Sequence, residues 1–327
     1  MGIVTPGPVW TVALVATVSL LLVLGCGSQT VVNQSATPVG VPRETTLVIG
    51  VTVPNVEEDQ DAFEEFQPLS DYLAARLGQL GIQEGRVLLA RSPVEMAKFM
   101  RQGKVDLYLD PTFASVIVNQ LSGSEPILSR WKKGVEKYHS VIFVSSSEGI
   151  NSLDDLLGKT IAFEDPGSTS AYFLPKAELL RRGYTLSEKQ GPTDPVAPEE
   201  IGHYFSMSDR QLVADVVTGT AAAGGQQEAE IMEYLDGAGQ ADDAAEVLLT
   251  TANIFRSMVS VRSGLDPRLR AGLKEVLLAM DDVPEGLPVL ETLSKTARFG
   301  DFGENSHAVF QDLQDLADLV EKEIVQR

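Results

Sequence analysis

The sequence predicts an α/β fold built on open, largely parallel sheets, and two observations support this prediction. First, β-prone runs alternate with helical patterns: strands at 47–53, 85–90 and 105–109 are separated by helices at 66–80 and 93–102. Second, the 327-residue chain keeps about 280 residues after its N-terminal region, enough for two domains with ordinary cores. In such sheets, ligands bind beyond the carboxyl ends of the strands.

The N-terminal region has the pattern of an export signal. Residues 1–25 contain no Lys, Arg, Asp or Glu, and Val9–Leu24 is almost continuously apolar. The segment Leu22-Val-Leu-Gly-Cys26 resembles a bacterial lipobox, which implies cleavage before Cys26 and lipidation of this residue, the only cysteine of the chain. We interpret 1–25 as a signal peptide and 26–46 as a flexible tether. An uncleaved anchor helix is the alternative, since the usual positive n-region is missing.

The charge of the chain excludes several classes of partner. The formal net charge is -20, from 26 basic and 46 acidic residues. A surface this acidic argues against binding to nucleic acid and against binding to anionic lipids by charge. An anion site in such a protein is expected to use local dipoles and close hydrogen bonds. The three histidines have no metal-ligand spacing, so no metal and no cofactor is predicted.

The segment most informative about function follows the predicted strand 160–163. It reads Asp165-Pro-Gly-Ser168-Thr169-Ser170 and continues with Ala, Tyr, Phe and Leu, which indicates a strand, a turn and the start of a helix. A helix start offers unpaired N–H groups and the positive end of the peptide dipoles. With these groups, the three hydroxyls are expected to hold an oxyanion without a basic side chain. The alternative is that Ser168 or Ser170 only caps the helix.

Polar residues also follow the strands of the first half. Asn55, Tyr108, Asp110 and Thr112 are expected at the carboxyl-end rim of the sheet, where a ligand would lie. Each of them also has an ordinary interpretation as a turn or core residue. In the second half we expect strands at 138–144, 221–225, 246–250 and 257–262. Helices are expected at 210–218 and 267–280, and an apolar stripe in the closing helix is expected to be core.

Three segments together resemble a known family. They are Tyr138-His-Ser-Val-Ile-Phe-Val144, Ser152-Leu-Asp-Asp-Leu-Leu-Gly-Lys-Thr160 and Asp165-Pro-Gly-Ser-Thr-Ser-Ala-Tyr-Phe-Leu-Pro175. They are similar to the phosphate-, phosphite- and phosphonate-binding proteins of ABC importers. The resemblance implies a type II periplasmic-binding-protein fold, with two lobes that are each a mixed sheet flanked by helices, joined by two crossing strands. It places 47–138 and 259–327 in lobe 1 and 139–258 in lobe 2, with crossings at 138–144 and 257–262.

The resemblance also implies ligand contacts. In the family the three hydroxyl residues bind the oxyanion, which assigns this role to Ser168, Thr169 and Ser170. A histidine of the family corresponds here to Asp209, and acidic or amide residues after the small strand correspond to Gln226 and Gln227. An ionised carboxylate accepts but does not donate hydrogen bonds, so Asp209 favours a ligand that keeps a proton or carries an amino or hydroxyl group. Asp209 as a plain helix N-cap, and His203 as the site histidine, are the alternatives.

The sequence therefore predicts a lipid-anchored, monomeric solute receptor on the outer face of the cytoplasmic membrane. It would bind a phosphorus oxyanion between Tyr108 with Asn55 of one lobe and the hydroxyls of the other, and pass it to a membrane permease. An enzyme is not expected, because the pattern Gly-x-Ser-x-Gly is absent around Ser168. A receptor for a membrane sensor kinase, or one for a different small polar solute, is the alternative.

Overall fold

The computed structural model describes residues 45–53, 56, 60–241, 243–303 and 306–325, all of which belong to one compact unit, residues 41–327. The predictions for the signal peptide, for lipidation of Cys26 and for Asn55 therefore lie outside the described residues. Over the described part of the chain, no helix combines the length and the apolar character that crossing a membrane requires.

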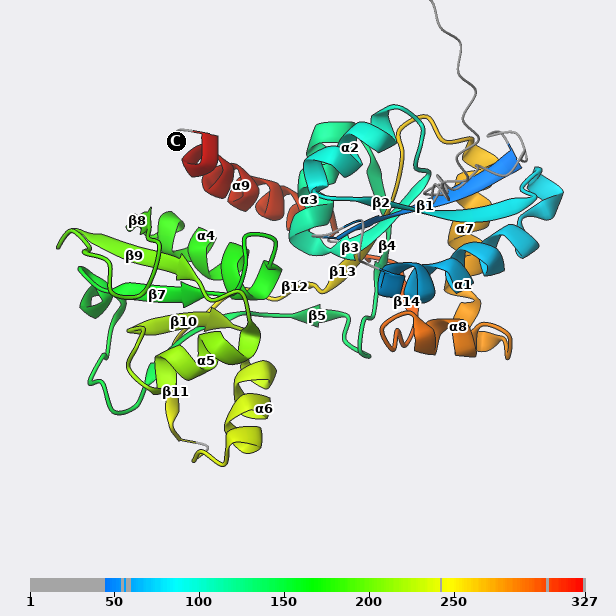
Figure 1. The fold of residues 1–327 in the computed structure, drawn as a ribbon. Coiled ribbons are helices and arrows are strands. Elements are labelled where there is room, and N and C mark those ends of the chain that lie inside the picture. The colour runs from blue at the N-terminus through cyan, green and yellow to red at the C-terminus, as the bar shows by residue number, and fades with distance from the viewer. Residues whose placement is uncertain (1–44, 54–55, 57–59, 242, 304–305, 326–327) are drawn as a thin grey trace, which may run out of the picture. The chain divides into compact units, whose positions relative to one another are not determined.

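The first lobe is built on a six-stranded mixed sheet with the order β14-β4-β13-β3-β1-β2 (Figure 1). Strand β1 pairs in parallel with β2 and β3, and β13 pairs antiparallel with β3 and β4. The strands are β1 (Thr46–Thr52), β2 (Glu84–Ala90), β3 (Leu107–Pro111), β4 (Glu125–Arg130), β13 (Ser257–Val261) and β14 (Phe299–Gly300). The helices are α1 (Gln60–Arg76), α2 (Pro93–Arg101), α3 (Thr112–Ser122), α7 (Pro267–Leu278) and α8 (Leu287–Thr292).

The second lobe has a six-stranded mixed sheet of its own, with the order β11-β6-β10-β7-β9-β8. Strand β7 pairs in parallel with β9 and β10, and β6 pairs antiparallel with β10 and β11. The strands are β6 (Val141–Ser145), β7 (Thr160–Phe163), β8 (Thr185–Glu188), β9 (Glu200–Phe205), β10 (Ala223–Gln226) and β11 (Ala245–Thr250). The helices are α4 (Leu174–Arg181), α5 (Asp209–Val217) and α6 (Glu228–Ala238).

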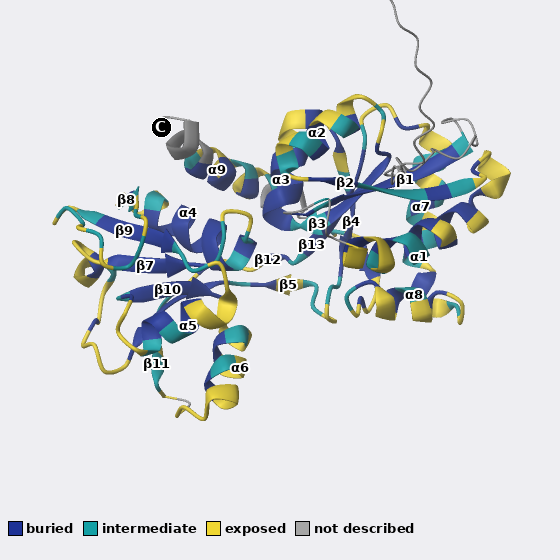
Figure 2. Ribbon diagram, viewed as in Figure 1, coloured by how far each residue is buried: buried dark blue, intermediate teal, exposed yellow. Residues whose placement is uncertain are grey.

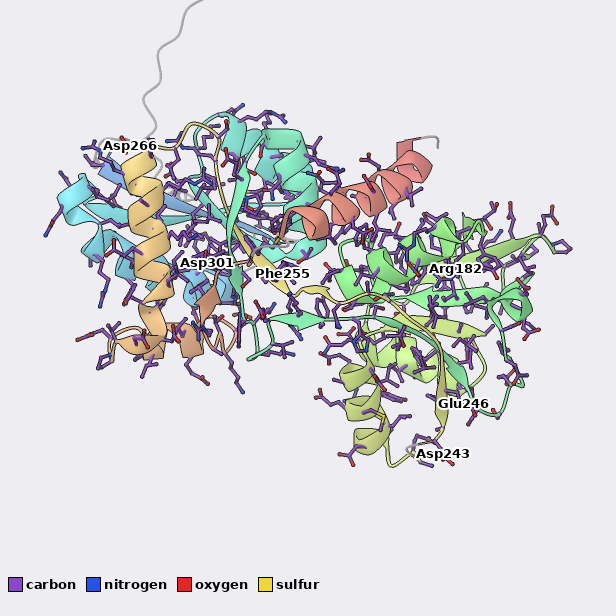
Figure 3. The ribbon with its side chains drawn as sticks, turned by 180° about the vertical axis from the view of Figure 1, so that it is seen from behind. Arg182, Asp243, Glu246, Phe255, Asp266 and Asp301 are labelled. Atoms are coloured by element: carbon purple, nitrogen blue, oxygen red, sulfur yellow. The ribbon has the colours of Figure 1, made fainter. Side chains whose placement is uncertain are left out.

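Two short strands connect the sheets. Strands β5 (Lys137–Tyr138) and β12 (Ile254–Phe255) pair antiparallel as a two-stranded sheet, and Phe255 lies at this link (Figure 3). The predicted α/β fold with two mixed sheets is confirmed. The sequence placed the crossings at 138–144 and 257–262, but β6 and β13 belong to the second and first sheets. Each apolar run continues from the link into a sheet strand, so hydropathy alone does not mark where the link ends.

The closing helix α9 (Ser306–Val325) packs on both lobes. It contacts α3 of the first lobe and α4 of the second, whereas the sequence placed the whole C-terminal part in the first lobe. Leu313, Leu316 and Val320 of its apolar stripe are buried in one hydrophobic cluster with residues from both lobes. In Figure 2, buried and exposed stretches alternate along the ribbon of α9.

Local sequence signals explain some of the helix boundaries. Ser92 caps α2 by accepting a hydrogen bond from the Glu95 N–H at 3.2 Å, and Pro93 occupies the first turn, where it needs no N–H partner. Gly81 ends the first helical region with a φ of 90°, in the left-handed region that glycine favours. Helix α3 was not predicted. Eight of its eleven residues are buried, so its sequence does not alternate between an apolar and a polar face, and this alternation is the pattern that predicts a surface helix.

Candidate functional site

A cavity of about 640 Å³ lies where the carboxyl ends of strands from both sheets meet. Its lining includes Thr52 and Asp110, at the ends of β1 and β3, and Glu164 and Gln226, at the ends of β7 and β10. The first turns of α2, α3, α5 and α6, and the turn that leads into α4, also line it. Several helix N-termini therefore border one space, and the positive ends of their dipoles favour an anionic ligand there.

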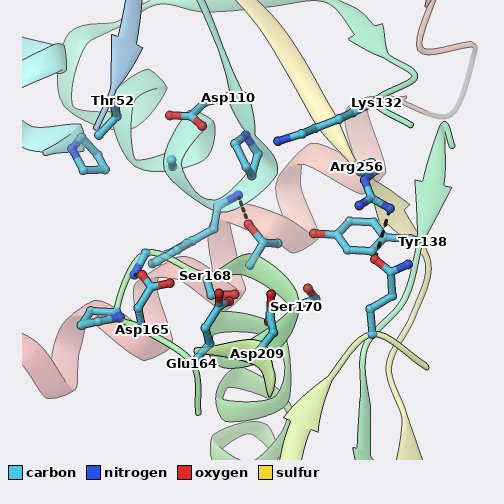
Figure 4. A pocket seen from close by; sticks show the side chains of 18 of the residues that line it. Thr52, Asp110, Lys132, Tyr138, Glu164, Asp165, Ser168, Ser170, Asp209 and Arg256 are labelled. Carbon is cyan, nitrogen blue, oxygen red and sulfur yellow. Dashed lines mark hydrogen bonds between the residues drawn. The ribbon is translucent and has the colours of Figure 1, made fainter. Parts of the chain in front are cut away.

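The three predicted hydroxyl residues all line this cavity, and Figure 4 shows Ser168 and Ser170 on its second-lobe wall. They begin a π-helical turn, η4 (Thr169–Phe173), which continues into α4. Ser168 Oγ accepts a hydrogen bond from the Ala171 N–H at 3.1 Å, so this residue does cap the turn. A capping hydroxyl uses only its acceptor side, and the hydrogen of Ser168 is directed to the Glu164 carboxyl group, from which an anionic ligand could take it over. Capping and anion binding are therefore compatible roles for Ser168.

Thr169 links the two lobes as well as lining the cavity. Its Oγ1 accepts a hydrogen bond from the Phe113 N–H of α3 at 3.3 Å. The ring of Phe113 also stacks on Phe173, with centroids 4.0 Å apart and planes at 11°. These two contacts hold the first turn of α3 against the hydroxyl turn of the other lobe. The N-cap residue of α3, Pro111, makes no side-chain cap hydrogen bond, so Thr169 supplies one at the start of this helix instead.

Six predicted ligand residues line the cavity: Ser168, Thr169, Ser170, Asp209, Gln226 and Gln227. Tyr108 does not line it. Its side chain is fully buried, and its hydroxyl donates to Asp110 and pairs with Thr52 Oγ1 at 2.9 Å, so Asp110 and Thr52 stand between it and the cavity. Thr112 is also buried, where its hydroxyl donates to the Phe255 carbonyl in the link.

Asp209, which stands at the position of the family histidine, belongs to a connected polar network. The Gln226 amide donates to the Asp209 carboxylate, the Gln227 N–H donates to Gln226 Oε1 at 2.7 Å, and Arg256 donates to Gln227 Oε1 at 3.2 Å. Asp209 is the first residue of α5, and Ser208 is its N-cap, so the plain capping interpretation of Asp209 is wrong. His203 does not line the cavity, because it is buried among the rings of Phe163, Tyr172 and Phe205.

Four basic side chains line the cavity, namely Arg91, Lys132, Lys133 and Arg256. The sequence analysis assigned no basic side chain to the site, and these four add positive charge to the lining beside the predicted hydroxyls. Lys132, in the loop between β4 and β5, extends into the cavity above Tyr138 (Figure 4). Burial, and then the charge of Arg130, lower the pKa of Lys132. A bound anion would offset both effects, so the site favours a ligand with negative charge beside this ammonium group.

Five carboxyl groups line the same cavity, from Asp110, Glu164, Asp165, Asp209 and Glu230. Burial raises the pKa of Asp110 to about 6, against the hydrogen bond from Tyr108 and the charge of Lys132. Burial, followed by the charge of Asp209, raises the pKa of Glu164 to about 7. Two of the five carboxyl groups thus change protonation in the pH range from about 5 to 8, where an oxyanion ligand also exchanges its proton.

We expect the substitution Glu164→Gln to stabilise the protein at pH 8 and to have a smaller effect at pH 5. The carboxyl binds its proton more tightly in the folded state, so the folded state holds more protons than the unfolded state between pH about 4.5 and 7. Stability contributed by this group is therefore lost as pH rises through that window. The measurement is the melting temperature of both proteins at four pH values. Glu148→Gln, at an exposed position, is the matched control, and equal differences at every pH would contradict the expectation.

Comparison with known proteins gives a family match over most of the chain. Residues 51–305 match the family described as ABC transporter, phosphonate, periplasmic substrate-binding protein. The phosphate-import protein PhnD of Mycolicibacterium smegmatis is 30% identical over 158 residues, which is 47% of this chain and 47% of that protein. The matched region thus spans about half the length of this relative.

Solved structures share the fold over most of the chain. XAC2383 from Xanthomonas citri, bound to ATP, superposes with a TM-score of 0.77 at 27% identity, covering 85% of this chain and 98% of that one. PhnD1 from Prochlorococcus marinus, in complex with methylphosphonate, gives a TM-score of 0.59 at 17% identity, covering 85% and 99%.

Proposed function

The chain belongs to the periplasmic substrate-binding proteins of phosphonate ABC transporters, and from this we propose that it binds a phosphonate, phosphite or phosphate ion in the cavity between its lobes. Members of this family are transport proteins and not enzymes; they work outside the cytoplasm with a small ligand and a membrane permease. The more specific proposal for this chain is the phosphorus oxyanion and the residues that hold it.

One observation supports this ligand class above the others. Ser168, Thr169 and Ser170 face the same cavity as Lys132 and Arg256, although the two sets come from distant parts of the sequence. Hydroxyl and backbone N–H donors would surround the tetrahedral oxyanion, and the cations would supply charge-assisted hydrogen bonds. A ligand that touches both lobes favours the closed state by its differential contacts, and this closure is the signal that the permease receives.

We also propose that the protein is attached to the membrane by a lipid on Cys26 and works as a monomer. The lipobox-like segment and the tether-like composition of residues 26–46 support the lipid attachment. Mass spectrometry of the mature protein tests it, because an acylated N-terminal Cys26 is expected and an unmodified residue 1 would contradict the proposal.

A larger phosphorylated solute is a second candidate. XAC2383, which is 27% identical, was solved with ATP, and a cavity of about 640 Å³ has room for a ligand much larger than phosphate. In this case the terminal phosphate would occupy the hydroxyl turn, and Arg91 at the start of α2 would lie near the remainder of the ligand.

Thermal unfolding with added methylphosphonate, phosphite, phosphate or ATP tests the proposal. A ligand at 100 times its Kd adds about 2.7 kcal/mol of stability, so at least one of them is expected to raise the melting temperature. Ser170→Ala is expected to weaken the binding of that ligand by about 1.5 to 3 kcal/mol, the contribution of a hydrogen bond to a charged group. Ser147→Ala, at an exposed turn, is the control. No shift with any of the four ligands would refute the assignment.

A further inference from the structure

We propose that Asp110 selects oxyanions that keep an acidic hydrogen, such as phosphonates, against fully ionised ones, such as sulfonates. This inference rests on the proposed function, because it assumes that the oxyanion group lies in the cavity that Asp110 lines. The hydroxyl turn, the helix N-termini and Lys132 attract any oxyanion, so none of them can distinguish a phosphonate from a sulfonate of the same shape.

Hydrogen bonds to its carbonyl group hold the backbone of Asp110 in place. It stands at the carboxyl end of β3, and its backbone carbonyl accepts hydrogen bonds from Ser257 at 2.8 Å and from Ser115 at 3.1 Å. Its carboxylate projects from the first-lobe wall of the cavity, across from Ser168 and Glu164 (Figure 4). An oxyanion held by the hydroxyl turn would therefore have this carboxylate on its opposite side.

The hydrogen-bond chain behind Asp110 makes it an acceptor. The hydroxyl of Tyr108 donates to Asp110 Oδ2, and the same Tyr108 oxygen pairs with Thr52 Oγ1 at 2.9 Å. Since Tyr108 has given its only hydrogen to Asp110, the hydrogen between Thr52 and Tyr108 comes from Thr52. Both donors thus point toward the carboxyl group, and this stabilises its ionised form. The Oδ1 oxygen retains acceptor capacity for a ligand.

The charged groups around Asp110 do not cancel this role. The cations Arg130 of β4 and Lys132 of the following loop lower the pKa of the carboxyl, and burial raises it more strongly, to about 6. Glu164 and Asp165 face it from the second-lobe wall. Arg130 is held by Glu65, by Thr296 and by the Leu293 carbonyl. At pH 7.5 Asp110 is therefore mainly an ionised acceptor, and below pH 6 it is mainly a protonated donor.

The ionised and the protonated forms of Asp110 are expected to differ in their selectivity between phosphonates and sulfonates. An ionised carboxylate accepts the P–OH hydrogen of a monoprotonated phosphonate, which gives a hydrogen bond between charged partners. A sulfonate has no such hydrogen, so it would leave two like charges facing each other beside a partly buried carboxylate. Protonated Asp110 donates to either ligand and no longer discriminates between them. The selectivity is therefore expected to be a property of the ionised form.

Calorimetric titration of the full chain with methylphosphonate and with methanesulfonate tests this inference. At pH 7.5 the protein is expected to bind methylphosphonate about 100-fold more tightly than methanesulfonate, as follows from one charged hydrogen bond gained or lost. Asp110→Asn keeps the shape of the side chain and replaces an acceptor by a donor, so it is expected to reduce the ratio to about tenfold or less. Asp165→Asn removes a charge from the other wall, and it should change both affinities without changing their ratio.

Titration of the unmodified protein at pH 5 provides a second measurement that does not depend on the folding of a variant. The ratio is expected to fall there, because methanesulfonate gains affinity once Asp110 is protonated, and to fall by the same factor in the Glu164→Gln protein, which lacks the other cavity carboxyl that changes protonation between pH 7.5 and 5. An Asp110→Asn protein with an unchanged ratio, or a ratio that is constant with pH, overturns the inference while methylphosphonate binding persists. Absence of binding by every phosphorus oxyanion tested would instead overturn the proposed function, and the inference with it.

Discussion

Replacement of Lys132 by methionine lowers the affinity for methylphosphonate by about 10- to 100-fold. Lys132 is a half-buried cation whose side chain extends into the cavity, and its burial makes a hydrogen bond to an anion stronger than it would be in water. Loss of a hydrogen bond between charged partners corresponds to about 1.5 to 3 kcal/mol. Methionine keeps the length and apolar stem of lysine, so the change isolates the ammonium group.

The control for this experiment is Lys98→Met. Lys98 is exposed in the last turn of α2, so its replacement removes the same charge at a position that does not line the cavity. Calorimetric titration of both variants separates the local effect from the change in net charge. If the two variants bind methylphosphonate equally well, Lys132 is not a ligand residue.

Replacement of Gly85 by alanine is expected to destabilise the protein by about 3 kcal/mol, near the upper end of the usual cost of overpacking. A Cβ atom at this position would lie 2.2 Å from the Ser70 carbonyl oxygen and 2.4 Å from its carbon. These are backbone atoms of α1, which packs directly on β2, and they cannot rotate away. Two further bonds hold this contact, from Ser70 Oγ to the Arg86 carbonyl at 3.1 Å and from Gln67 Nε2 to the Gly85 carbonyl at 3.0 Å.

Gly78→Ala provides the matched control. A Cβ atom at Gly78 would meet no described atom within 4 Å, and an unstrained Gly-to-Ala change usually adds about 0.4 to 1 kcal/mol of stability. Denaturant unfolding of the two variants measures the difference. Equal stability of both variants would show that α1 can move away from β2 at little cost.

The fold and the hydroxyl turn were predictable because their signals are local. The alternation of strands and helices is visible over ten to twenty residues, and Ser168, Thr169 and Ser170 are adjacent in the sequence. The turn begins after β7 as predicted, because Asp165-Pro-Gly interrupts the strand. Residues that are consecutive in the sequence are necessarily close in space, so their common position can be predicted without knowing how the chain folds.

The charged part of the site was not predictable in the same way. Arg91, Lys132 and Arg256 come from three separate loops, before α2, between β4 and β5, and between β12 and β13, and only the topology brings them to one cavity. The basic segment 130–133 was visible, but its first member, Arg130, is buried in the first lobe while Lys132 faces the cavity. Tyr108 and Asp110 are two residues apart on β3 and so point to the same face, but Tyr108 lies within the core and Asp110 near the carboxyl end of the strand, at the rim. The residue types alone do not indicate how far the core extends along the strand.

The contacts of helix α9 have a consequence for the energetics of the receptor. Because it packs on α3 of one lobe and on α4 of the other, rotation of the lobes has to shear at least one of these apolar interfaces. The stiffness of the hinge therefore depends partly on side chains such as Leu313 and Val320, which do not line the cavity. Changes in their size would tune how readily the receptor opens, and hence how long it retains its solute, while leaving the chemistry of recognition untouched.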